Sequence, residues 1–84
     1  MHSMRARWTR QARKDLERLP AREARRVVAA VAAAIRGDGN ADVKKLVGRD
    51  GIRIRAGNWR IIAAVEGDEM EIRRVASRGD VYKG

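Results

Sequence analysis

The chain has 84 residues, which fits one small domain near the lower limit for a self-sufficient core. It contains no cysteine, which excludes disulfides and thiolate metal sites and suits the cytosol. Lys and Arg number 20 against 11 acidic residues, a net charge of +9 that favours a nucleic-acid partner, although a high-GC genome would also enrich arginine.

The first predicted elements are a strand and a helix. Residues 4–8 alternate in polarity and predict an edge strand. Thr9 is a suitable N-cap for a helix over residues 10–19. The apolar face of this helix consists of residues at i, i+4 and i+7: Ala12, Leu16 and Leu19.

A second helix is predicted over residues 21–37, after Pro20 has ended the first. Its apolar stripe consists of Ala24, Val27, Val28, Val31 and Ile35. Gly37 is its stop signal. The two segments together predict an antiparallel helical hairpin.

The remaining residues predict a polar loop and three strands. Val43 and Leu46 are expected to anchor the loop, and the strands are expected over residues 52–56, 59–66 and 70–76. In the last strand Met70 and Ile72 share a phase that Val75 breaks, which predicts a bulge near Arg73 and Arg74. The order β-α-α-β-β-β predicts an α+β fold, with a small antiparallel sheet packed on the helical hairpin in one domain over residues 1–84.

Arginines recur on one face of the predicted sheet. Alternation places Arg53, Arg55 and Arg60 opposite the isoleucine core, where they form either a solvated face or a surface for a polyanion. Exposed arginines at such positions are expected to matter little for folding. A structural alternative pairs Arg60 with Glu71 across a hairpin. Trp59 shares its phase with Ile61 and is expected in the core.

Few catalytic chemistries are compatible with these residues. His2 is the only histidine, so a metal centre and a serine nucleophile activated by histidine are both disfavoured, and no cofactor motif is present. What remains is a cluster of arginines with Tyr82 near the C-terminus. RNA carries its own nucleophile, the 2′-hydroxyl, so a protein that orients it and stabilises the phosphorane can cleave the chain. Guanidinium groups suit charge stabilisation and are poor proton-transfer groups.

Four segments occur in an order and spacing that resemble the RelE/ParE superfamily of bacterial toxins: "ARKDLERLP", "DVKKLVG", "RIRAGNWRII" and "RRVASRGDVY". The resemblance covers residues 8–82 and implies the same β-α-α-β-β-β fold. It also implies a cytoplasmic toxin, with no membrane association, that is inhibited by a cognate antitoxin. That partner is expected to be small, acidic and partly disordered, and operator DNA is expected to be bound only through the antitoxin complex.

The resemblance also assigns roles to residues. For a RelE-like enzyme that cuts mRNA on the ribosome without metal or other cofactor, it implies catalytic roles for Arg53, Arg60, Arg78 and Tyr82. It implies RNA contacts for Arg55, Lys44 and Lys45. The sequence departs from the common pattern at Ser77, where many relatives have histidine, and at Arg53, where the best-known relatives have lysine. Two alternatives stay open: a ParE-like poison of DNA gyrase that is not an enzyme, and an inactive relative that binds an antitoxin.

Overall fold

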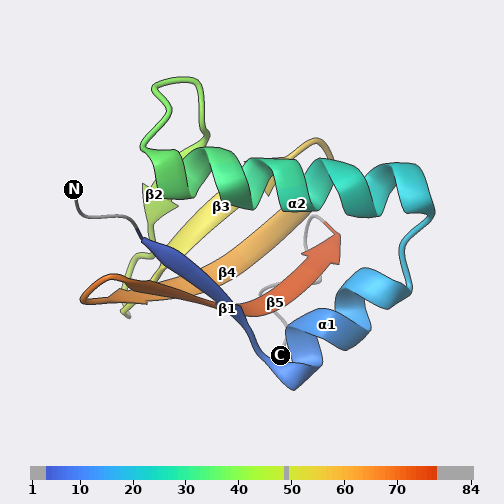
Figure 1. Ribbon diagram of the computed structural model, residues 1–84, viewed down its shortest axis with the longest axis horizontal. Coiled ribbons are helices and arrows are strands. Elements are labelled where there is room, and N and C mark those ends of the chain that lie inside the picture. The colour runs from blue at the N-terminus through green and yellow to red at the C-terminus, as the bar shows by residue number, and fades with distance from the viewer. Residues whose placement is uncertain (1–3, 49, 78–84) are drawn as a thin grey trace.

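The computed structural model describes residues 4–48 and 50–77 as five strands and two helices (Figure 1). In chain order these are β1 (Arg5–Trp8), α1 (Arg10–Glu17), α2 (Ala21–Arg36), β2 (Val43–Lys45), β3 (Ile52–Ala56), β4 (Trp59–Glu66) and β5 (Glu69–Ser77). The predicted elements are all present with ends within two residues of expectation, and β2 is additional. The α+β class predicted from the sequence is confirmed.

The strands form a single mixed sheet in the order β1-β5-β4-β3-β2. The prediction of a wholly antiparallel sheet is wrong in one respect, since β1 lies parallel to β5. No tight turn constrains the direction of β1, because the whole of the helical segment separates it from the other strands. β2 forms where a loop was expected, and its residues pair with the edge of β3, Lys44 lying opposite Arg53. This pairing satisfies backbone groups that a free edge would leave open.

Both helices begin at the residues that the sequence indicates and α2 ends at its predicted stop signal, whereas α1 ends at Glu17, two residues earlier than predicted. Thr9 caps α1, its hydroxyl oxygen accepting a hydrogen bond from the amide of Ala12 at 3.1 Å. Pro20 is the N-cap residue of α2. Gly37 ends α2 in the left-handed region with φ of 71°, a conformation that glycine adopts without a steric cost.

The core lies between the helices and the sheet face that they cover. In Figure 1, α2 crosses the strands and α1 lies beside one end of β5. The largest fully buried side chains are Ile54, Ile61, Ile72 and Val27. Trp59 packs against this core, as predicted, and Trp8 does so too. Val28 lies at the border of the apolar stripe of α2 and is 45% exposed. None of the helices in the described part of the chain is long and apolar enough to span a membrane.

The predicted bulge in β5 is confirmed. Ile62 of β4 lies opposite Arg74, whereas the next residue, Ala63, lies opposite Ile72, so Arg73 is the extra residue of β5. The hydroxyl of Thr9 donates a hydrogen bond to the carbonyl of Arg73 at 3.2 Å. The bulge therefore shifts the phase of β5 so that Ile72 and Val75 both reach the core.

Candidate nucleic-acid interface

The outer face of the sheet, opposite the helices, carries cationic side chains in two adjacent rows. The first row crosses four strands through Lys44, Arg53, Ile62 and Arg74. The second crosses three strands through Arg55, Arg60 and Ala76. Directly opposed residues on one sheet face have Cβ atoms about 4.5–5.5 Å apart. Lys44, Arg53, Arg55, Arg60 and Arg74 are therefore gathered on one surface, here called the basic face.

Arg60 differs from its prediction. Its position opposite Arg55 on the face away from Ile61 agrees with the alternation, but it is only 6% exposed, so the expectation of an exposed arginine is wrong. Nη1 of Arg60 donates to the carbonyl of Gly57 at 3.1 Å and to that of Trp59 at 3.2 Å. The side chain folds back over the β3–β4 turn, and these bonds hold its guanidinium in place.

The alternative prediction, that Arg60 pairs with Glu71 across the hairpin, is also contradicted by the strand register. Arg60 lies opposite Ala76, and Glu71 lies opposite Ala64, further along the hairpin. Glu71 forms ion pairs with Arg7 and Arg73.

Arg53 has guanidinium nitrogens without partners. Its Nε and Nη2 atoms are buried and make no hydrogen bond. An unsatisfied buried donor on a charged group costs about 1–3 kcal/mol or more, so such a group needs an explanation. These two unpaired donors are a local cost of placing Arg53 on the basic face.

Of the other predicted contact residues, Arg55 and Lys44 lie beside Arg53 and Arg60 on the basic face. Arg55 is paired with Asp42, at 3.5 Å, and its side chain is 47% exposed. Lys44 is exposed in β2 directly opposite Arg53. Lys45 is also exposed, but it alternates to the other side of the sheet, opposite Ile52, so it does not join the basic face. Arg78 and Tyr82 lie outside the described residues.

Asp15 and Arg74 were not predicted as site residues from the sequence. Asp15 of α1 is 7% exposed, and its Oδ2 atom accepts hydrogen bonds from Nε of Arg74 at 3.2 Å and from the amide of Val75 at 2.9 Å. A signal was available, because Asp15 falls three residues after Ala12 and four before Leu19, inside the apolar stripe of α1.

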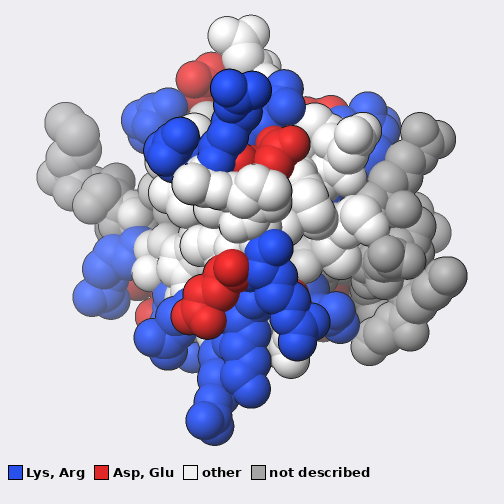
Figure 2. Space-filling view, turned by 90° about the vertical axis from the view of Figure 1, so that its right-hand side faces the viewer, with Lys and Arg blue, Asp and Glu red and all other residues white. Residues whose placement is uncertain are grey.

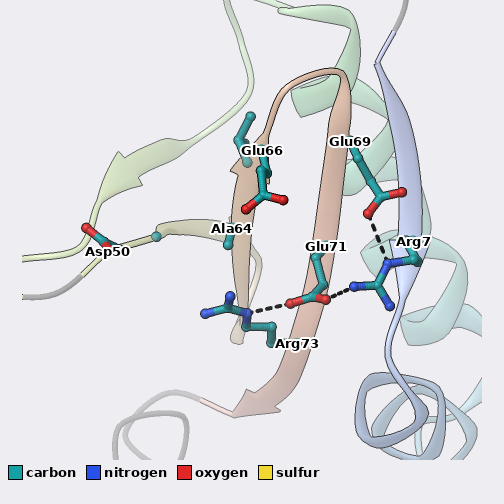
Figure 3. Close-up of a pocket in the computed structure, with 9 residues that line it drawn as sticks. Arg7, Asp50, Ala64, Glu66, Glu69, Glu71 and Arg73 are labelled. Atoms are coloured by element: carbon teal, nitrogen blue, oxygen red, sulfur yellow. Dashed lines mark hydrogen bonds and ion pairs between the residues drawn. The ribbon is translucent and has the colours of Figure 1, made fainter.

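The end of the outer face near the β4–β5 turn has the opposite charge. A hollow of about 430 Å³ lies there, and its lining includes Asp50, Glu66, Glu69 and Glu71, together with Arg7 and Arg73 (Figure 3). Arg7 pairs with Glu69 and Glu71, and Arg73 pairs with Glu71. Within the described part of the chain, no group of three or more acidic or histidine side chains could hold a metal ion. The outer face thus has a basic end and an acidic end.

The helices carry cationic side chains of their own. Figure 2 shows Lys and Arg gathered in two groups, one over α2 and one over α1, separated by a band of uncharged residues. On α1 the residues Arg10, Arg13, Lys14 and Glu17 line a shallow depression. On α2 the guanidinium of Arg26 lies against Gly57, so this helix reaches the same turn that Arg60 binds from the outer face.

The fold has close counterparts among solved toxin structures. The crystal structure of a RelB–RelE antitoxin–toxin complex from Methanococcus jannaschii matches with a TM-score of 0.74 and 29% identity, covering 90% of this chain and 94% of that one. An archaeal RelE–RelB complex from Pyrococcus horikoshii matches with a TM-score of 0.73 and 26% identity over 94% and 98% of the two chains. The DinJ–YafQ complex of E. coli shares the fold alone, with a TM-score of 0.75 and 11% identity over 95% and 98%.

Sequence comparison identifies the family. No curated protein sequence matches the chain. The model of the family described as the ParE toxin of type II toxin–antitoxin systems, parDE, matches residues 6–82, nearly the whole chain. The RelE-type structural matches show that this chain has the fold of the RelE/ParE superfamily. The chain therefore belongs to the ParE toxin family, in the RelE/ParE superfamily, and is a toxin of a type II toxin–antitoxin system.

Proposed function

We propose that this toxin is a metal-independent endoribonuclease that cleaves mRNA on the ribosome. The observation that carries the proposal is the basic face, on which four cationic residues of β2, β3 and β4 lie in two adjacent rows: Lys44, Arg53, Arg55 and Arg60. A phosphate group of RNA offers several acceptor oxygens in a geometry that guanidinium forks match. The relatives of known structure at 26–29% identity are RelE toxins, which supports the same assignment.

The proposed chemistry uses the nucleophile of the substrate. The 2′-hydroxyl attacks the adjacent phosphorus, and the bond from phosphorus to the 5′-oxygen of the next nucleotide breaks. A proton leaves the 2′-oxygen, and the departing 5′-oxygen gains one. Arg60 and Arg53 would stabilise the charge that develops on the phosphorane, Arg60 from a position already held by the turn carbonyls. Arg78 and Tyr82 are proposed as further catalytic residues, Tyr82 for the proton or for stacking on a base. Arg55 and Lys44 are proposed to bind the RNA backbone, whereas Lys45, on the other side of the sheet, is not part of this surface.

Dependence on the ribosome follows from the shortage of proton-transfer groups. Arginine scarcely deprotonates near neutral pH, and Ser77 stands where many relatives have histidine. Rate acceleration must then come mainly from orientation, which a ribosome-bound mRNA supplies. We therefore expect purified toxin to cut programmed ribosomes and to leave free RNA nearly intact. Efficient cleavage of free RNA in the presence of a chelator would contradict ribosome dependence.

The partner proposed for this toxin is a cognate antitoxin. Two matching structures are antitoxin–toxin complexes of RelB with RelE. An acidic, partly disordered segment would complement the net charge of +9 and fold on binding. We propose that it covers the basic face and the C-terminal segment. An antitoxin that contacted neither surface would contradict this mode of inhibition.

A second candidate is a ParE-like poison of DNA gyrase, favoured by the name of the matching family model. Expression of the toxin without antitoxin separates the two candidates. If the toxin is the endoribonuclease, we expect translation to stop, which pulse-labelling of newly made protein measures. Induction of the DNA-damage response with continued translation would instead support the gyrase poison and overturn the proposal.

A further inference from the structure

Asp15 connects helix α1 to the outer face of the sheet. Its carboxylate is nearly buried and accepts hydrogen bonds at both oxygens: Nε2 of Gln11 donates to Oδ1 at 2.8 Å, and the amide of Val75 donates to Oδ2 at 2.9 Å. The third donor is Nε of Arg74, at 3.2 Å. β1 pairs with β5 only as far as Ile72, so Asp15 takes the place of a strand partner for the next stretch of β5.

Arg74 has one side of its guanidinium in use and one side available. Among the described residues its recorded hydrogen bond is through Nε, to Asp15, and its side chain is 36% exposed. The edge formed by Nη1 and Nη2 can still donate two parallel bonds to an anion. Since Arg74 is bound at Nε by a buried carboxylate, it loses less freedom on binding an anion than an unattached arginine would.

The register places this available edge beside the proposed phosphate site. Arg74 and Arg53 lie on either side of Ile62 in the same cross-strand row. Ile62 is 6% exposed although it lies on the outer face, away from the core between sheet and helices. Long cationic side chains cover apolar neighbours with their stems and keep their charged ends at the surface.

The neighbouring Arg73 provides the contrast. Arg73 is more exposed than Arg74 and is also paired through Nε, but its partner is Glu71, at 2.7 Å, and both line the acidic hollow (Figure 3). Any anion there meets Glu66, Glu69 and Glu71. Two consecutive arginines of equal charge therefore have opposite surroundings.

We propose that Arg74 is a further phosphate-binding residue of the basic face and that Asp15 positions it. The proposal rests on the function proposed above and adds to it a second phosphate contact, one strand away from β4 and on the far side of Ile62 from Arg53. The ligand is a phosphate of the RNA backbone, and a run of single-stranded RNA along the row Arg53–Ile62–Arg74 would present successive phosphates to the two guanidinium groups.

The test measures binding of a fluorescent single-stranded RNA of 2′-O-methyl nucleotides, which lack the nucleophile and cannot be cleaved. Affinity is measured over a series of salt concentrations for the wild type, Arg74→Ala and Arg73→Ala. Arg74→Ala is expected to lose about tenfold in affinity and to reduce the salt slope by about 0.7, the value for one phosphate contact on a single strand. Arg73→Ala, with the same loss of charge, is expected to stay within about twofold. Arg74→Lys should recover only part of the affinity, because an ammonium lacks the fork.

The Asp15→Asn variant tests whether Asp15 positions Arg74 for RNA binding or affects RNA binding only through the net charge of the protein. It raises the net charge by one, so simple attraction predicts tighter RNA binding. Our proposal predicts weaker binding, because Arg74 loses its charged anchor while the amide oxygen can still accept from Val75. Thermal unfolding identifies any variant that fails to fold, and the comparison of Arg74→Ala with Arg73→Ala does not depend on Asp15→Asn.

The outcomes distinguish this inference from the proposed function. Equal losses for Arg73→Ala and Arg74→Ala, with a wild type that binds RNA, would overturn the role of Arg74 and leave the endoribonuclease proposal intact. Tighter binding by a folded Asp15→Asn would overturn the positioning role. A wild type that fails to bind the RNA at low salt would overturn both the role of Arg74 and the function on which it rests.

Discussion

Arg55 and Arg60 lie directly opposite each other on β3 and β4, two guanidinium groups on one face of the sheet at the end where the strands turn. Like charges in this position destabilise a sheet. The structure offsets the repulsion by giving each arginine its own acceptors: Asp42 for Arg55, and the carbonyls of Gly57 and Trp59 for Arg60. A local arrangement that costs stability and collects positive charge is typical of a site built for an anion.

Arg60→Ala is expected to reduce both activity and stability. The loss of a preorganised charge-stabilising donor typically lowers the rate by about 10²–10³-fold. Since Arg60 is buried and donates to two carbonyls, its removal should also lower the free energy of unfolding by about 1–3 kcal/mol. Cleavage on programmed ribosomes and chemical denaturation measure the two effects. Arg55→Ala is the control and should change stability by no more than about 0.5 kcal/mol.

Asp15→Ala is expected to be among the most destabilising single changes in α1. It removes a buried carboxylate and leaves the amide of Val75 and Nε of Arg74 without an acceptor. The expected loss is about 2–4 kcal/mol of unfolding free energy. Glu17→Ala, on the exposed side of the same helix, serves as the matched control and should be nearly neutral. Similar midpoints of denaturation for the two variants would show that the Asp15 contacts contribute little.

Gly57→Ala and Gly67→Ala form a pair that isolates one contact. Both glycines have φ of 62°, so alanine meets a similar backbone cost of about 1–2 kcal/mol at each. A Cβ at residue 57 would lie 3.0 Å from Nη1 of Arg26, whereas a Cβ at residue 67 would meet nothing within 4 Å. We expect Gly57→Ala to be the more destabilising and Arg26→Ala to remove the difference. Equal unfolding free energies for the two glycine variants would show that the Arg26 side chain does not contact residue 57.

The wild-type protein is expected to bind single-stranded RNA with a strong dependence on salt. Each phosphate neutralised contributes about −0.7 to the slope of log affinity against log salt concentration. Contacts from Arg53, Arg60 and Arg74 alone would give a slope near −2 on this estimate. Fluorescence anisotropy over a range of potassium chloride concentrations measures this slope. A slope near zero would be incompatible with binding through the basic face.

The sequence by itself determined every element of the fold except β2, and it determined the side of the sheet on which the arginines lie. Local signals were sufficient here, because Thr9, Pro20 and Gly37 act on their own helix ends and the alternation around Ile54 and Ile61 depends only on strand geometry. The bulge at Arg73 was also predictable, since a change of apolar phase within one strand requires an extra residue.

Only the tertiary structure decided which partners these residues have. The parallel pairing of β1 with β5, the added strand β2 and the contact of Asp15 with Arg74 join residues far apart in the sequence, whose meeting depends on how the layers pack. The burial of Arg60 was decided in the same way, because alternation sets the direction of a side chain but not what folds over it. Charge alone could not separate Arg73 from Arg74. Their surroundings differ, with the acidic hollow around Arg73 and the buried carboxylate of Asp15 beside Arg74, and only the packing of the layers sets this difference.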